Sequence, residues 1–315
     1  TSPEMVQLLQ RPIVDNGQWF TFAKLVDKYG VVPKYVMPDT QCSPDTKYVT
    51  RILESKLRLA AKQLRDADAT DASHEDIYEI KQRHMAGIYD ILCCFLGQPP
   101  QVFDFEYCDI NGEHHSLAGI TPLAFFREYG GMKTDDYMTV IHHPLLSRPY
   151  LKTYTVSSAE KSDLSKRLNL DIDTIKQLVI AQLTAGEQVV MGCDVAKQSH
   201  KPTGYMHKDL FAYEKVFGTE IEIMEKAERI RYKDTFGRHV MTFSGVSLDD
   251  NGKPLRWKVH NSYGESMGIA GHYVMDDSWF DEHVLSVVIN KKYASAEINQ
   301  AYCEPPEQLD RRELY

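Results

Sequence analysis

RHVMTFSGVSLDDNGKPLRWKVHNSYG, residues 238–264, predicts a strand, a polar turn at 248–252 and a returning strand. Apolar residues recur along both arms, and the turn-forming residues Asp, Asn and Gly gather between them. A hairpin of this kind brings its two ends together. One end carries an imidazole, His239, and the other carries a carboxamide, Asn261. The fold of this stretch therefore decides whether these two side chains can meet.

The pairing register of this hairpin is open at the level of sequence. A loop centred near Asp250 makes His239 and Asn261 direct cross-strand partners, with Cβ atoms roughly 4.5 to 5.5 Å apart. A two-residue turn at 251–252 instead pairs Thr242 with Asn261, which leaves His239 about 10 Å away along the strand. The spacing permits a hydrogen bond between the imidazole and the carboxamide without requiring it. A lone histidine on a strand is also more often structural than catalytic.

The second half of the chain is predicted to contain further strands. Apolar runs predict further strands at QVVMGCDV (188–195) and HYVMDD (272–277), and helical spacing predicts a helix over 172–185. The first half is mostly helical. An amphipathic stretch stops at Gly30, and two long helices are predicted to form a hairpin. The fold class expected is α+β, helical first and mostly antiparallel sheet afterwards.

Local signals place the elements of the helical half. Ser43 and Pro44 predict the start of the first long helix, which runs to about Arg65, and the second ends at Gly97. Alternation around the Asn-Gly pair at 111–112 predicts a β-hairpin. The last signals are Thr121 and Pro122, which start a short helix, TPLAFFREYG.

Composition bounds the class of protein. The 315 residues are 43% hydrophobic, enough for a substantial core, and the formal net charge is −9. The 36 basic residues are scattered, which makes nucleic acid an unlikely partner. No apolar run reaches the roughly 18 residues of a membrane span, and the N-terminus does not resemble a signal peptide. We expect a soluble, cytoplasmic protein without a membrane contact.

Cysteine and histidine spacing gives no sign of a metal site. The six cysteines are far apart at irregular spacing, which favours reduced thiols, and no CxxC or HxxxH pattern occurs. We expect no metal and no cofactor. Cys93 and Cys94 lie in an apolar helical run and are expected to pack in the core. The histidine pairs at 114–115 and 142–143 fall in predicted loops, where surface histidines are the usual finding.

Seven stretches resemble the aminopeptidase C and bleomycin hydrolase family, a branch of the papain-like cysteine peptidases. The two that carry chemistry resemble the family's His and Asn signatures. The resemblance spans nearly all of the chain in collinear order. The stretches are DNGQWFTFAKLVDKYGVVPKYVMPDT (15–40), GQPPQVFDFEY (97–107), ITPLAFFREY (120–129), GEQVVMGCDVAK (186–197), FAYEKVFG (211–218), RHVMTFSGVS (238–247) and RWKVHNSYGESMGIAGHYVMDDSWFDEHV (256–284).

The resemblance implies a papain-like fold in three parts. Residues 1–42 would be the remainder of the left, helical domain, residues 43–150 a helical insertion and hairpin subdomain, and residues 151–315 the right, β domain that carries His and Asn. It also implies peptide substrates and a homo-oligomer, a hexamer in this family. The helical hairpin is then a candidate contact surface between subunits.

The resemblance assigns a role to each matched residue. His239 would deprotonate the cysteine thiol and protonate the leaving amine, and Asn261 would orient the imidazole. Gly17 would let a substrate backbone approach closely because it has no Cβ. Cys193 and Asp194 fall where the family lines a substrate pocket.

Several positions depart from the family pattern. Asn16 stands where the family has the first of two glycines, His260 replaces an acidic residue, and Tyr263 replaces the Trp that shields the His–Asn contact. The tail YCEPPEQLDRRELY differs from the family's ending, which weakens the case for exopeptidase selectivity.

The catalytic cysteine of the family has no counterpart in the sequence. No G-x-C-W string occurs, so we expect that cysteine and its oxyanion-hole Gln to precede Thr1. The sequence thus predicts a cysteine-type aminopeptidase or peptidase, conditional on that segment. The alternative is a non-catalytic papain-like scaffold that binds peptides or assembles into oligomers.

Overall fold

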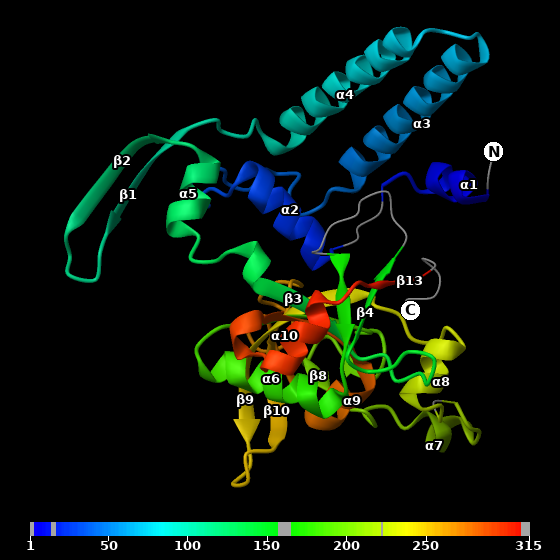
Figure 1. Cartoon of the computed structure of the whole chain (residues 1–315), viewed down its shortest axis with the longest axis vertical. Helices are drawn as coiled ribbons and strands as arrows, with labels where there is room; N and C mark the ends of the chain where they lie inside the picture. Colours follow the sequence, from blue (N-terminus) through cyan, green and yellow to red (C-terminus); the bar gives the residue numbers. More distant parts are fainter. Residues whose placement is uncertain (1–2, 14–16, 157–164, 222, 310–315) are drawn as a thin grey trace. The chain divides into compact units, whose positions relative to one another are not determined.

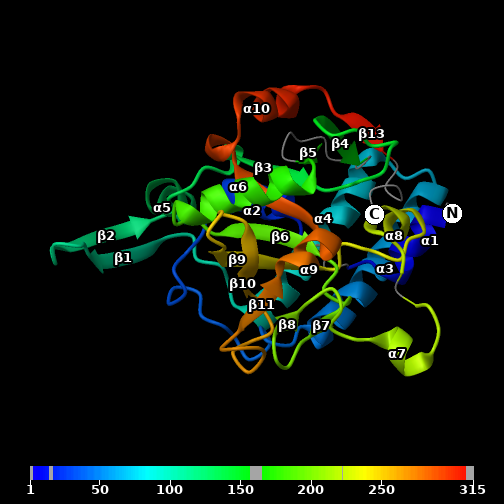
Figure 2. The same cartoon turned by 90° about the horizontal axis from the view of Figure 1, so that it is seen from below.

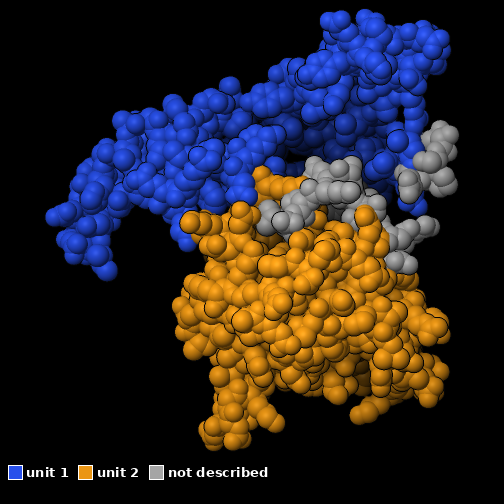
Figure 3. All heavy atoms as spheres, viewed as in Figure 1, with its two compact units in different colours: residues 1–16, 25–131 blue, residues 17–24, 132–315 orange. Residues whose placement is uncertain are grey.

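The computed structural model describes residues 3–13, 17–156, 165–221 and 223–309. These fall into two compact units, shown in Figure 3. Unit 1 comprises residues 1–16 and 25–131, and unit 2 comprises residues 17–24 and 132–315. The three-part division expected from the family resemblance stays a prediction.

Unit 1 is built around an antiparallel pair of long helices, α3 (Lys47–Ala69) and α4 (His74–Leu96), preceded by α1 (Pro3–Gln10) (Figure 1). Ser73 begins α4 with a capping box, since its side chain accepts from the N–H of Asp76. The predicted cap at Ser43 is wrong. The Ser43 hydroxyl accepts from the N–H of Thr40 instead, and α3 begins four residues later.

The helix pair of unit 1 buries few side chains. Val49, Leu53 and Ala60 are buried on α3, and on α4 the buried residue is His84, whose Nε2 lies 2.8 Å from the Gln63 carboxamide oxygen. The expectation that Cys93 and Cys94 pack in the core is wrong: Cys94 is exposed and Cys93 is half-buried. Two helices paired side by side have a narrow shared face, so an apolar run does not imply burial.

The rest of unit 1 is a two-stranded ribbon, β1 (Phe103–Cys108) and β2 (His114–Ile120), followed by α5 (Pro122–Tyr129) (Figures 1 and 2). The hairpin predicted at Asn111–Gly112 is confirmed. Thr121 caps α5 as predicted, because its hydroxyl accepts from the N–H of Ala124. The helix α2 (Trp19–Tyr29) belongs to unit 2 as far as residue 24 and to unit 1 from residue 25. It ends before Gly30, where a Cβ would lie 2.1 Å from the Pro122 carbonyl carbon.

Unit 2 is built on an eleven-stranded sheet with strand order β13-β4-β5-β3-β12-β6-β9-β10-β11-β8-β7. Three pairings are parallel, β3 with β5, β4 with β13 and β8 with β11, and the other pairings in the described part of the sheet are antiparallel. The strands are β3 (Tyr137–Ile141), β4 (Lys152–Val156), β5 (Arg167–Asn169), β6 (Val189–Cys193), β7 (Ser199–His200), β8 (Tyr205–Met206), β9 (His239–Leu248), β10 (Pro254–His260), β11 (His272–Asp276), β12 (Val284–Asn290) and β13 (Glu307–Leu309).

Helices flank this sheet and connect its strands. The longest is α6, predicted from sequence and observed over Ile172–Thr184; Asp171 caps it by accepting from the N–H of Thr174. The others are α7 (Tyr213–Phe217), α8 (Lys226–Arg231), α9 (Asp277–His283) and α10 (Ala296–Cys303), with single 3-10 turns at η1 (Thr134–Asp136) and η3 (Lys291–Tyr293). The α+β class expected from the sequence is confirmed.

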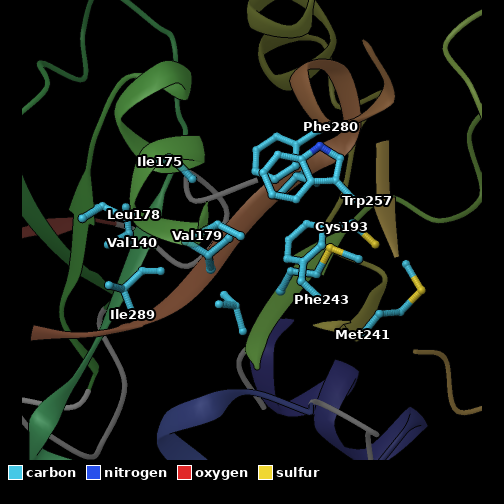
Figure 4. Packing of buried hydrophobic residues seen from close by; sticks show 14 of the residues in the cluster. Val140, Ile175, Leu178, Val179, Cys193, Met241, Phe243, Trp257, Phe280 and Ile289 are labelled. Atoms are coloured by element: carbon cyan, nitrogen blue, oxygen red, sulfur yellow. The ribbon is translucent and has the colours of Figure 1, made fainter. Parts of the chain in front are cut away.

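The core of unit 2 lies between α6 and the central strands. Figure 4 shows Ile175 and Val179 of α6 in the same cluster as Phe243, Trp257 and Phe280. These three rings pack with centroids 4.9 to 5.3 Å apart. Burial of such aromatic surface is the largest favourable contribution available to a core. It fixes β9 and β10, the strands that carry the candidate site.

A buried polar cluster corrects a third expectation from sequence. His142 and His143 are 7% and 2% exposed, so they are not surface residues. The ammonium of Lys226 donates to His142 Nδ1 at 2.8 Å and to two carbonyl oxygens. Burial lowers the pKa of His142 to about 2 and that of His143 to about 4, so both rings are neutral. The carboxamide of Asn169, the last residue of β5, accepts from the N–H of His143 and donates to its carbonyl oxygen, which fixes the segment after β3 to the sheet.

Candidate functional site

His239 and Asn261 meet at one end of the β9–β10 hairpin. His239 is the first residue of β9, and Asn261 follows the last residue of β10. The imidazole Nε2 lies 2.8 Å from the carboxamide Oδ1, which is a hydrogen-bond distance. Asn261 is 6% exposed and His239 is half-buried. The contact that the sequence permitted is therefore present.

The register that produces this contact is neither of the two considered from sequence. His260 pairs with Thr242, so position 261 falls opposite position 241 rather than 239. His239 and Asn261 are then diagonal neighbours on one face, roughly 7 to 8 Å apart at their Cα atoms. An imidazole and a carboxamide together are long enough to bridge that distance. The separation of about 10 Å belonged to the register that pairs Thr242 with Asn261, in which His239 is three positions away along the strand; in the observed register it is two positions away.

A backbone donor fixes the orientation of the Asn261 amide. The N–H of Ser262 donates to Asn261 Oδ1 at 2.8 Å, so the oxygen and not the NH2 group must face that side. The same oxygen faces His239 Nε2, and an oxygen without a proton can only accept. Nε2 therefore carries the ring proton in this contact. Since the other nitrogen, Nδ1, makes no hydrogen bond within the described residues and is not sealed by burial, it is left to accept a proton.

Tyr263 lies against His239. Its ring stacks on the imidazole of His239 with centroids 4.8 Å apart and an interplanar angle of 17°. The ammonium of Lys201 lies 4.8 Å from the centre of the Tyr263 ring, a cation–π contact. Burial raises the pKa of the Tyr263 phenol, and the neighbouring Cys193 adds to the rise. The Tyr263 ring thus lies against one face of the imidazole, and its shielding of the His239–Asn261 contact stays a prediction.

Cys193 lies directly opposite His239 in the sheet. The two are cross-strand partners of β6 and β9. Burial raises the pKa of the Cys193 thiol far above its usual range, and the adjacent Asp194 adds to the rise. A thiol held protonated is a poor nucleophile. Cys193 and Asp194 both have no exposed surface, and their place in a substrate pocket stays a prediction.

The remaining predicted residues are reported as the structure places them. Gly17 is exposed, and a Cβ built on it would meet no atom within 4 Å. Its predicted approach to a substrate backbone stays a prediction. Asn16 lies outside the described residues. His260 is exposed and pairs across the strands with His272, with ring centroids 4.8 Å apart.

Sequence reasoning missed the contacts that hold the segment before His239. Asp194 accepts from the N–H of Phe236 at 3.2 Å and pairs with the guanidinium of Arg238. The available signal was an aspartate immediately after an apolar strand, together with an arginine immediately before the histidine. An acidic residue in that position is costly to bury unless it has a partner.

One group of metal-ligating side chains gathers within the described residues of unit 1. Asp109, Glu113 and His115 bring one ligand atom each within 4.8 Å of one another. All three are on or beside the β1–β2 turn, and Asp109 already accepts from the N–H groups of Asn111 and Glu113. Those bonds account for the position of Asp109 without an ion.

Comparison with known proteins gives consistent results. The chain matches the Peptidase C1-like family over residues 1–313. Aminopeptidase C of Streptococcus thermophilus is 37% identical over 308 residues, which are 96% of this chain and 68% of the relative. Bleomycin hydrolase of Mus musculus is 34% identical and shares 92% of this chain and 66% of its own length. The chain thus spans about two thirds of these relatives.

A solved structure confirms the papain-like fold expected from the sequence. The crystal structure of pepw from Lactobacillus rhamnosis HN001 (DR20) superposes with a TM-score of 0.90 at 41% identity. The match covers 98% of this chain and 70% of that one. Within the described residues, no helix has both the length and the apolar character to cross a membrane.

Proposed function

The chain belongs to the Peptidase C1-like family, and from that premise we propose that it carries the His and Asn half of a cysteine peptidase site. His239 is the general acid and base, and Asn261 orients it. The nucleophilic cysteine comes from a segment that precedes Thr1. The observation that carries the proposal is the shared acceptor: Asn261 Oδ1 takes both the Ser262 N–H and the His239 Nε2–H, which leaves Nδ1 available.

The chemistry that follows is thioester acyl transfer. Nδ1 of His239 takes the proton of the cysteine thiol, and the resulting thiolate attacks the peptide carbonyl carbon. The imidazolium then gives that proton to the leaving amine as the C–N bond breaks, and an acyl-enzyme remains. The same nitrogen then deprotonates a water molecule, whose oxygen attacks the thioester carbonyl carbon. The C–S bond breaks, the acid is released, and the cysteine sulfur regains its proton from the imidazolium. Asn261 stabilises the imidazolium through Nε2 in each step.

Peptides are the proposed substrates, and an aminopeptidase is the proposed type. The names of the relatives support both, since they include aminopeptidase C and bleomycin hydrolase. Approach of substrate over Gly17, shielding by Tyr263, a homohexamer and a cytoplasmic location belong to the same proposal. Tyr263 has the best support among these, because its ring lies against the imidazole.

The test uses the protein produced from its complete gene. Rates are measured on aminoacyl-coumarin and blocked peptide-coumarin substrates, together with labelling by a thiol-directed epoxide and intact mass. His239→Ala is expected to lower kcat by roughly 10²- to 10⁴-fold, the usual contribution of a general acid–base group. His260→Ala is the matched control, because that exposed imidazole is one residue from Asn261 and outside the proposed machinery.

Two outcomes would contradict the proposal. One is an unlabelled protein without hydrolysis of either substrate, which would favour the non-catalytic peptide-binding scaffold. The other is full activity in His239→Ala. Cleavage of only the free aminoacyl substrate supports an aminopeptidase, and cleavage of the blocked substrate supports an endopeptidase.

A further inference from the structure

Asp194 is buried beside the segment that leads into His239. It follows the last residue of β6 and has no exposed surface. One carboxylate oxygen, Oδ2, accepts from the N–H of Phe236 at 3.2 Å. The other, Oδ1, lies 3.3 Å from Nε of Arg238. Both partners therefore belong to the three residues that precede His239.

The same segment is held at further points. The N–H of Arg238 donates to the Cys193 carbonyl at 3.1 Å, beside the last residue pair of β6 and β9. Upstream, Lys197 pairs with the Asp234 carboxylate at 2.9 Å. The residues just after β6 thus clamp the residues just before β9. Asp194 is the fully buried charged member of this clamp, which we define as Asp194, Lys197, Asp234, Phe236 and Arg238.

Burying a carboxylate is unfavourable unless its partners compensate. Burial raises the pKa of Asp194, while the Phe236 N–H, the Arg238 guanidinium, the Lys197 ammonium and the Ala196 N–H oppose the rise. The first two of these four partners are fixed only if residues 236–238 follow their observed path. The carboxylate of Asp194 consequently favours the observed path of residues 236–238 over other paths of this segment, in which the carboxylate would lose these partners.

We propose that Asp194 is a positioning residue for His239. It holds residues 236–238 so that His239, the first residue of β9, orients its imidazole with Nε2 toward Asn261 and leaves Nδ1 available. The inference rests on the proposed function, because it names a residue that acts through the proposed general base. Displacing a reacting group by about 1 Å can lower a rate by roughly 10²-fold. A carboxylate that acts through the position of the imidazole can therefore govern turnover.

The experiment separates positioning from general stability. In the complete protein, Asp194→Ala is expected to lower kcat about 10²-fold with little change in KM, and Asp194→Asn, which keeps an acceptor for the Phe236 N–H, to lower it less. Arg238→Gln removes the guanidinium from a half-exposed side chain and is expected to lower kcat about tenfold without impairing folding. Asp277→Asn is the matched control, since Asp277 accepts from Lys176 and Trp257 elsewhere in unit 2.

A second readout needs no catalysis. Imidazole ¹⁵N NMR reports which ring nitrogen of His239 carries the proton, and the wild type is expected to show the Nε2–H form. Asp194→Asn and Arg238→Gln are expected to mix the two forms, whereas Asp277→Asn lowers Tm without mixing them. Wild-type kcat and tautomer in both Asp194→Asn and Arg238→Gln would overturn the positioning role. An inactive wild type would refute the proposed function, while the NMR comparison would still decide the role of Asp194.

Discussion

The β1–β2 hairpin of unit 1 and the β9–β10 hairpin of unit 2 close with the same turn. Their loops are DINGE at 109–113 and DDNGK at 249–253. In the first, one carboxylate oxygen of Asp109 accepts two backbone N–H groups, both at 2.9 Å. In the second, Asp249 accepts the two equivalent N–H groups, both at 2.8 Å. Both loops also place a glycine at positive φ, 82° and 79°.

The two hairpins differ in what lies beside them. β9 and β10 pair on both outer edges, with β6 and β11, and bury Phe243 and Trp257. β1 and β2 pair only with each other among the described strands, and their aromatic residues contact α5, as in Phe105 on Phe125. A shared turn therefore closes a hairpin, while neighbouring strands determine whether its open end can hold two side chains in a fixed geometry.

The largest expected difference between the hairpins concerns the residue that follows each returning strand. Asn261 follows β10 and accepts from His239, whereas Thr121 follows β2 and caps α5. Asn261→Ala should lower kcat by about 10²-fold or more, since the imidazole loses its orienting acceptor. Thr121→Ala should lower the stability of α5 by about 1 kcal/mol and leave kcat unchanged. Steady-state kinetics and urea unfolding measure both.

A reversed pattern, with activity lost in Thr121→Ala and kept in Asn261→Ala, would refute the contrast.

The next largest difference between the two hairpins concerns the free energy of unfolding. Trp257 is 1% exposed and packs against Phe243 and Phe280, whereas Phe105 is half-buried. Trp257→Ala should destabilise unit 2 by about 3 to 5 kcal/mol, the usual result of emptying a buried aromatic site. Phe105→Ala should destabilise the β1–β2 ribbon by less than half of that. Hydrogen exchange of the amides in each hairpin during urea titration distinguishes the two units; equal losses would show that the ribbon is as well packed as the sheet.

Sequence reasoning found the elements whose signals are local. The hairpin at Asn111–Gly112, the cap at Thr121 and the helix over 172–185 were all predicted, because each depends on neighbouring residues. The His239–Asn261 contact was also anticipated, though its register was not. Register depends on which of several possible loops Asp249 stabilises, and a string rich in Asp, Asn and Gly admits more than one.

What sequence could not supply were contacts between distant segments. The buried His142 is one example, since Lys226, 84 residues later, donates to its ring. The pairing of Asp194 with Arg238 is of the same kind. Each of these joins residues whose proximity is decided only by the completed sheet.

A smaller effect tests the shared turn itself. Gly112 and Gly252 have positive φ, and a Cβ on either would meet no atom within 4 Å. Alanine there should cost only the backbone strain, about 1 kcal/mol at each site, and the two costs should be similar. Local amide exchange measures them. A much larger cost at Gly252 would show that the surrounding sheet also constrains the turn.

The smallest expected effect concerns the pKa values of the two turn carboxylates, Asp109 and Asp249. Hydrogen bonds from backbone N–H groups, led by Glu113 and Lys253 respectively, lower the pKa of Asp109 and of Asp249. Since each pKa is lowered on folding, each turn is fully stabilised above the usual value near 3.8 and weakens as pH falls through the lower folded value. The charge of Lys253 also lowers the pKa of Asp249. At Asp109, hydrogen bonds from the side chains of His115 and Asn111 lower the pKa further.

Salt should therefore raise the pKa of Asp249 more than that of Asp109, because ions screen an exposed ammonium more than they weaken a short hydrogen bond. The Asn111 and Asn251 amide shifts, followed against pH at low and high ionic strength, report the two titrations. Lys253→Gln should abolish the excess salt response at Asp249 while leaving the turn closed. Equal responses in the wild type would mean that the fifth loop residue, Glu in one hairpin and Lys in the other, has no electrostatic part in the turn, and that hydrogen bonding alone holds both loops.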